Sequence, residues 1–148
     1  MDESLQQFLL RNNYTKVKLH LTKTNHFEII GKINNVKGIF ILDTGASSSC
    51  IGKNKIEKFK LKVTDSEVKA AGAGAIDMDT QLSKNNSVKF RKWKLPKVQL
   101  VVFDLSHVNT ALENHNSKPV DGIIGADILK KGKAVIDYQK KYLYLKSV

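Results

Sequence analysis

The sequence contains one cysteine, two prolines and one tryptophan among 148 residues. The single cysteine, Cys50, excludes an internal disulfide framework and is typical of a reducing compartment. No segment is apolar over the roughly 18 residues needed to cross a bilayer. The chain opens on Met1-Asp2-Glu3, whose charge is wrong for a signal peptide. We therefore expect a cytoplasmic protein without a membrane span.

Metal-ligand spacing is also absent from the sequence. No His, Cys or acidic pair has the spacing of a zinc site, so we expect neither a metal nor another cofactor. Cys50 has no evident partner histidine, and a small buried hydrophobe explains it better than a nucleophile does. Ser47, Ser48 and Ser49 lack a Gly-x-Ser-x-Gly context, so helix capping and loop hydrogen bonds explain them better than serine catalysis does.

The composition is that of an ordinary globular domain, with 41% hydrophobic and 26% charged residues. The net charge is +11, from 25 Lys and Arg against 14 Asp and Glu. Such a balance favours anionic partners. Only two of the basic residues are arginines, the lysines are scattered, and no RNA-binding aromatic signature is present. We therefore do not expect nucleic acid to be the partner.

The most informative stretch is an apolar run that ends in an acid. Residues 39–42 predict a buried strand, and Asp43, Thr44 and Gly45 follow it directly. A carboxylate at the end of such a strand is costly to bury unless another group pairs with it or uses it. Gly45 permits a tight turn that exposes backbone N–H groups beside the acid. This stretch is a candidate active site.

A second apolar stretch lies about eighty residues later. It reads Ile123-Ile124-Gly125, and residues 126–131 can form the helix that follows. The chain ends in two short apolar segments, residues 134–138 and 142–145, which predict a closing hairpin.

The two stretches together resemble the retropepsin-like aspartic proteases. Asp43-Thr44-Gly45-Ala46 is similar to the active-site signature of that family, and Ile123-Ile124-Gly125 is similar to the apolar pair and glycine that precede its helix. The resemblance covers roughly positions 25 to 146, with order and spacing preserved. It implies a mainly β fold: a small closed β-barrel of retropepsin type with one or two short helices. We expect one such domain over residues 16–148, behind an N-terminal leader over residues 1–15.

The resemblance also assigns roles to residues. Asp43 is expected to be catalytic, with Thr44 and Gly45 shaping its loop. Ile124 and Gly125 would support the site from the neighbouring strand. Substrate would contact Ala46 and a glycine-rich flap, Ala71, Gly72, Ala73 and Gly74. An ordinary glycine-rich turn is the alternative for the flap.

One Asp-Thr-Gly implies two chains. Aspartic proteolysis needs two carboxylates that share a proton, one as general base and one as general acid. Asp121, Asp127 and Asp137 lack the Thr-Gly context, so we expect a homodimer in which Asp43 faces its symmetry mate. Because Ala46 has no hydroxyl to offer the carboxylate, we expect activity at weakly acidic to near-neutral pH. The alternatives are a peptide- or protein-binding module that does not cleave, and a basic nucleic-acid-binding barrel.

The remaining pattern predicts short elements. Residues 1–13 form a short helix or a frayed leader. Strands are expected from Lys16 and over 27–33, 36–42, 88–93 and 97–103; helices over 53–59 and 108–112; tight or polar turns at 34–35 and 84–86.

Overall fold

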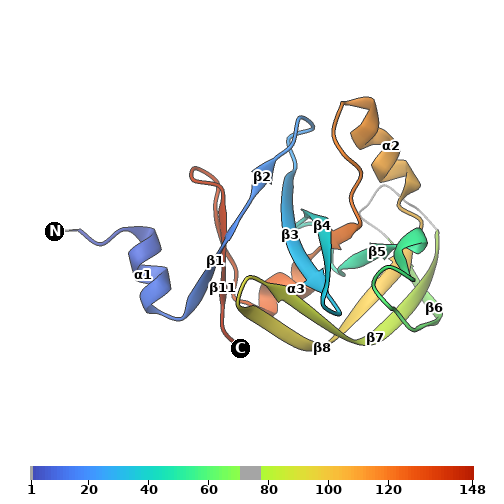
Figure 1. The fold of residues 1–148 in the computed structure, drawn as a ribbon, viewed down its shortest axis with the longest axis horizontal. Helices are drawn as coiled ribbons and strands as arrows, with labels where there is room; N and C mark the ends of the chain where they lie inside the picture. The colour runs from blue at the N-terminus through green and yellow to red at the C-terminus, as the bar shows by residue number, and fades with distance from the viewer. Residues whose placement is uncertain (1, 71–77) are drawn as a thin grey trace.

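A closed barrel of six strands forms the body of the protein. The computed structural model describes residues 2–70 and 78–148. Neighbouring barrel strands pair in the order β3 (Phe27–Ile33), β4 (Val36–Leu42), β9 (Gly122–Ile124), β5 (Cys50–Gly52), β8 (Trp93–Phe103) and β7 (Met78–Phe90). Strand β7 pairs back onto β3 and so closes the barrel (Figure 1). Strands β2 (His20–Leu21) and β6 (Val63–Ala70) extend β3 and β7. This is the predicted mainly β barrel.

A second, three-stranded sheet joins the two ends of the chain. Its order is β1 (Tyr14–Lys18), β11 (Tyr142–Lys146) and β10 (Val135–Asp137). Helix α1 (Leu5–Arg11) precedes β1 and carries the N-terminus away from the barrel (Figure 1). Helix α2 (Ser106–Asn114) lies between β8 and β9, and α3 (Ala126–Lys131) follows β9. None of these helices, which are all that the described residues form besides a 3-10 turn, is long and apolar enough to span a membrane.

The barrel interior is filled by alternate residues of the strands. Phe40, Phe59, Phe90 and Trp93 are almost fully buried in the larger of two apolar clusters. The Trp93 indole nitrogen donates to the carbonyl of Lys146 at 2.8 Å, which ties the last strand to the barrel. The smaller cluster covers the outer face of β4 near its end, where Ile41 packs with residues of β8, β9 and α2. Both faces of the end of β4 are therefore buried, as its continuous apolar run predicts.

Elements with a strong local signal have the predicted bounds. Strands β3 and β4 and helix α3 begin and end where the sequence predicts, and the closing hairpin is β10 and β11. Asn34 and Asn35 form the turn between β3 and β4 with φ angles of 51° and 67°. Asparagine tolerates this left-handed region better than other non-glycine residues. Helix α1 confirms the helical alternative for residues 1–13, and the first strand begins at Tyr14, two residues before the predicted start.

Other predicted elements are wrong, because pairing with distant strands overrides local preference. The predicted helix over 53–59 is one 3-10 turn, Lys53–Lys55, followed by further turns, and residues 50–52 before it form strand β5, which pairs with β8 and β9. The predicted polar turn over 84–86 is an irregularity inside β7, where the Asn86 amide donates to the carbonyls of Ser83 and Val98. Strand β8 runs through Pro96 without a break, and α2 is longer than the predicted 108–112.

Candidate active site

Asp43 begins the loop between β4 and β5. Its backbone N–H donates to the carbonyl of Ile124 at 2.9 Å, which continues the β4–β9 pairing by one residue. One carboxylate oxygen accepts from the Gly45 N–H at 2.9 Å. Asp43 is half-buried, whereas Thr44 and Gly45 are exposed. The fold therefore fixes the direction of the carboxylate and leaves the turn beside it open to solvent.

Gly125 brings the two predicted halves of the site together. A Cβ atom at this position would lie 2.6 Å from the Ala46 carbonyl oxygen and 3.1 Å from the Ser48 carbonyl oxygen. Both obstacles are backbone atoms and cannot rotate away. The next residue, Ala126, donates its N–H to the Ala46 carbonyl at 2.7 Å. The chain around Gly125 thus packs directly against the Asp43 loop.

Gly122 allows a second close approach. A Cβ atom there would collide with the carbonyl oxygen of Cys50. Strand β9 is therefore held between β4, which it pairs in parallel, and β5, which it pairs antiparallel. Two glycines, one at the start of β9 and one just after its end, set the position of the strand under the loop.

A buried hydrogen-bond network that the sequence did not predict lies behind the loop. Ser49 is fully buried, and its hydroxyl donates to one carboxylate oxygen of Asp127 at 2.7 Å. The same hydroxyl accepts from the Gly125 N–H at 2.9 Å, and the Ser49 N–H donates to the other oxygen of Asp127 at 3.1 Å. Ser49 therefore joins the Asp43 loop to α3 and does not cap a helix after residue 52. The available signal was an acid in the first turn of α3, directly after Gly125.

The side chains next to the carboxylate are small and buried. Ala46 is 5% exposed and packs with Ile41 and Ile123 in the smaller apolar cluster. Burial raises the pKa of the Cys50 thiol to about 12, and the negative charges of Asp127 and Asp43 add to the effect. A thiol in this state is protonated at neutral pH and is a poor nucleophile. This confirms that Cys50 is a buried hydrophobe.

The predicted flap residues, Ala71, Gly72, Ala73 and Gly74, lie outside the described residues. The strands that lead to them are described, since β6 and β7 form an antiparallel pair whose last register is Ala70 opposite Met78.

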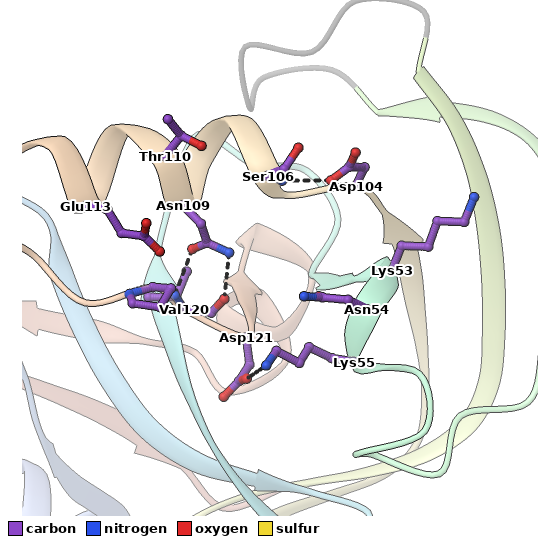
Figure 2. A pocket seen from close by; sticks show the side chains of 11 residues that line it. Lys53, Asn54, Lys55, Asp104, Ser106, Asn109, Thr110, Glu113, Val120 and Asp121 are labelled. Atoms are coloured by element: carbon purple, nitrogen blue, oxygen red, sulfur yellow. Dashed lines mark hydrogen bonds and ion pairs between the residues drawn. The ribbon is translucent and has the colours of Figure 1, made fainter.

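A polar cleft of about 610 Å³ opens at the opposite end of β9 from Asp43. Figure 2 shows α2 on one side of it and the 3-10 turn on the other. The buried Asp121 carboxylate accepts from the Ile39 N–H at 3.0 Å and pairs with Lys58 at 3.0 Å and with Lys55 at 3.6 Å. Asp121 is thus engaged in holding β9 against β4, away from the Asp43 loop.

A family profile described as aspartyl protease matches residues 29–128 of the chain. The match includes Asp43, Gly125 and the Ser49–Asp127 network, and it ends at Ile128, the third residue of α3. Comparison with curated proteins finds no match.

Solved structures of similar fold include three proteases or protease-like domains. A retropepsin-like aspartic protease from Rickettsia conorii has 22% identity and a TM-score of 0.56, and the match covers 89% of this chain and 91% of that one. The EIAV protease in complex with the inhibitor HBY-793 has 21% identity and a TM-score of 0.53, covering 74% and 90%. The retroviral protease-like domain of Ddi1 from Leishmania major has 19% identity and a TM-score of 0.56, covering 82% and 88%. These similarities confirm that the barrel is of the retropepsin type.

Proposed function

Because the chain belongs to the aspartyl protease family, we propose that it is an aspartic endopeptidase in which Asp43 carries the chemistry. The observation that carries this proposal is the setting of Asp43. The carboxylate stands at the end of a doubly buried strand, accepts one N–H from Gly45, and is half-exposed beside an open turn. A buried scaffold that presents one partly accessible acid suits a group that must exchange protons with substrate.

The reaction requires a second carboxylate. One ionised carboxylate takes a proton from a water molecule while the water oxygen attacks the peptide carbonyl carbon. A protonated carboxylate donates to the carbonyl oxygen, which becomes a hydroxyl of the tetrahedral intermediate. Collapse of this intermediate transfers a proton to the leaving amine and breaks the C–N bond. Two carboxylates that share one proton supply both roles.

The second carboxylate in our proposal is Asp43 of the partner subunit. The chain has one Asp-Thr-Gly, and the other described acids near the loop are engaged elsewhere. Asp127 is bound to Ser49, and Asp121 is bound to Lys58. A two-fold axis beside the loop would bring the two Asp43 side chains together. Thr44 is exposed on the same turn, where the family resemblance implies that it braces Thr44 of the partner subunit.

The proposed substrate is a peptide or protein in extended conformation. Residues 71–74 are small, which would let the backbone of a flap approach the backbone of a substrate and form main-chain hydrogen bonds. Residues 71–74 are the proposed substrate contacts, whereas Ala46, which the sequence predicts as a further contact, is buried and supports the loop from inside.

The test is cleavage of a denatured-protein mixture, scanned over pH and enzyme concentration, by the wild type and by Asp43→Asn. Asparagine has nearly the same size but cannot share the proton, so we expect cleavage to fall by at least about 10³-fold. Asp2→Asn is the matched control, because it removes the same charge from an exposed position near the N-terminus. Its cleavage should equal that of the wild type.

A mixing experiment tests the shared site. Excess Asp43→Asn protein added to a fixed amount of wild type should form mixed dimers and lower its activity, whereas excess Asp2→Asn should raise the total. If Asp43→Asn leaves the wild-type rate unchanged at every ratio, the two-chain site is wrong. Cleavage that survives in Asp43→Asn alone would contradict the catalytic role of Asp43. Absence of cleavage by every protein would favour the binding module.

A further inference from the structure

Four lysines stand opposite one another across four consecutive strands of the barrel. Lys37 on β4 pairs with Lys32 on β3, Lys32 pairs with Lys89 on β7, and Lys89 pairs with Lys94 on β8. Residues opposite each other in antiparallel strands have Cα atoms about 5 Å apart and side chains on the same face. We call these four residues the lysine ladder.

The ladder lies on the surface and forms no ion pair with any residue that the structure describes. Lys32, Lys37 and Lys94 are exposed, and Lys89 is half-exposed. The ion pairs among the described residues involve Glu3 and Asp121 as acids, and neither pairs with a ladder lysine. The acid on the same face of β3, Glu28, lies four residues from Lys32. Like charges placed directly opposite in a sheet destabilise it, so this arrangement carries a cost within the free chain.

A basic groove continues from the ladder at the Asn34–Asn35 turn. It has a volume of about 470 Å³ and is lined by Asn34, Lys60, Lys62, Thr64, Leu82, Lys84, Asn85 and Asn86. Three of the lining residues are lysines, and none is acidic. Asn34 connects the two features, since it follows β3 and its side chain accepts from the Ser87 N–H on β7. Lys32 of the ladder and Asn34 of the groove are two residues apart in the chain, so we treat the ladder and the groove as one basic surface.

This surface lies at the end of the barrel opposite the candidate active site. Lys37 is near the start of β4, and Asp43 follows its end. At about 3.3 Å per residue of strand, six residues separate them by roughly 20 Å. A molecule bound to the ladder therefore leaves the Asp43 loop free.

We infer that the lysine ladder and its groove bind an extended acidic segment of a protein partner. The four ammonium groups and the groove lysines can pair with successive carboxylates, which removes the repulsion within the ladder. If the proposed peptidase function holds, the surface is a substrate exosite, and it selects proteins with an acidic stretch at least about six residues from the cleaved bond.

The side-chain chemistry favours this partner over nucleic acid or a lipid surface. Nucleic-acid surfaces combine basic residues with aromatic rings on which bases stack, and neither the ladder nor the groove contains an aromatic residue. A flat layer of lipid headgroups cannot enter the groove, whereas a single extended chain can. The amides of Asn34 and Asn86 form hydrogen bonds within the protein, whereas the amide of Asn85 is exposed and can bond to a peptide backbone.

The test measures fluorescence anisotropy of a labelled poly-glutamate peptide, at low and high salt. The protein carries Asp43→Asn throughout, so the result does not depend on whether the chain cleaves peptides. In the ladder variant, Lys32, Lys37, Lys89 and Lys94 become Gln. In the control variant, the exposed lysines Lys18, Lys118, Lys130 and Lys140 become Gln, which changes the net charge by the same amount.

We expect the ladder variant to bind the peptide at least about tenfold more weakly, since each exposed ion pair contributes a fraction of a kcal/mol. The control variant should bind within about twofold of the parent, and salt should weaken binding to the parent. The peptide should also raise the melting temperature of the parent and not that of the ladder variant.

Three results would overturn the inference. Equal loss of binding in both variants would mean that net charge alone attracts the peptide. Equally tight, ladder-dependent binding of poly-uridylate or of phosphatidylserine vesicles would assign the surface to those partners instead. No binding of the peptide by the parent at low salt would mean that the ladder is only a solvated surface. A failure here leaves the proposed role of Asp43 untouched, because that role is tested by cleavage.

Discussion

Strand β4 runs between two ends of the barrel whose charged side chains differ in how they are paired. At its end, the carboxylates of Asp43 and Asp127 accept hydrogen bonds from backbone N–H groups, and Asp127 also accepts the Ser49 hydroxyl. Near its start, Lys37 belongs to a ladder of like charges without an ion pair among the described residues. The carboxylates at the Asp43 end are therefore hydrogen-bonded within the protein, whereas the lysines near the start of β4 are left to solvent or to a partner. Substitutions at the two ends should therefore differ in effect, with the largest loss of stability at the Asp43 end.

Gly125→Ala should lower stability and activity more than the other substitutions do. Its Cβ atom would meet two backbone carbonyl oxygens, so the loop and the strand must separate. We expect the free energy of unfolding to fall by about 2–4 kcal/mol, and cleavage to be lost with the loop geometry. Urea denaturation and the cleavage assay measure both. Gly52→Ala is the control, because the nearest atom to its Cβ is the movable Asn54 side-chain oxygen at 3.1 Å. An equal loss of unfolding free energy in both variants would contradict a special role for the contact between Gly125 and the Asp43 loop.

Ser49→Ala should lower the free energy of unfolding by about 1–3 kcal/mol. The change leaves the Gly125 N–H without its acceptor, and it removes one of the two hydrogen bonds to Asp127 Oδ1, the other being donated by the Ile128 N–H. Ser47→Ala is the matched control, since Ser47 is an exposed serine of the same loop. Denaturant titration of the two variants separates the network from a general effect of losing a hydroxyl. If the two curves coincide, the network contributes nothing to the loop.

Alkaline pH should weaken the Asp43 end through Cys50. Its folded-state pKa, raised to about 12, lies above the ordinary value of 9.0. The folded chain therefore keeps a proton that the unfolded chain releases, and stability present below pH 9 is lost as pH rises toward about 12. By pH 10 the loss is about 1.4 kcal/mol. Cys50→Ala should lack this component, and the difference between the two denaturation profiles across pH isolates it from lysine and tyrosine titration. Parallel profiles from pH 8 to pH 11 would contradict the assignment.

Lys32→Glu should have the smallest effect and the opposite sign. It places an acid between Lys37 and Lys89, so we expect the free energy of unfolding to rise by about 0.5 kcal/mol at low salt. The gain should vanish near 1 M salt, where the screening length is only about 3 Å. Lys130→Glu, at an exposed position on α3, is the control for net charge. A decrease in stability at low salt would mean that the ladder is not repulsive.

Features with a local signal were predictable from the sequence. The end of β4 at Asp43 follows from an apolar run that stops at an acid, and the Asn34–Asn35 turn follows from the tolerance of asparagine for positive φ. The start of α3 follows from a glycine before a helical segment. In each case neighbouring residues supply most of the free energy that selects the conformation.

Features that depend on distant partners were not predictable in this way. The serines before Cys50 suit a helix cap as well as a loop, and only pairing with β8 and β9 turns residues 50–52 into a strand. Asn85 and Asn86 suit a turn, yet the neighbouring strand β8 keeps β7 continuous across them. Local preferences of this size are a fraction of a kcal/mol and give way to tertiary hydrogen bonds and burial.

The sequence by itself determined the candidate site of this protein: one aspartate in an Asp-Thr-Gly turn at the end of a buried strand, and a glycine after a second apolar stretch that can pack against this turn. The tertiary structure alone decided which groups surround that chemistry. The hydrogen bond between Ser49 and Asp127 and the alignment of the four ladder lysines both depend on strand register. Register is set by pairing between residues far apart in the chain, and a shift of one residue would turn each side chain to the other face.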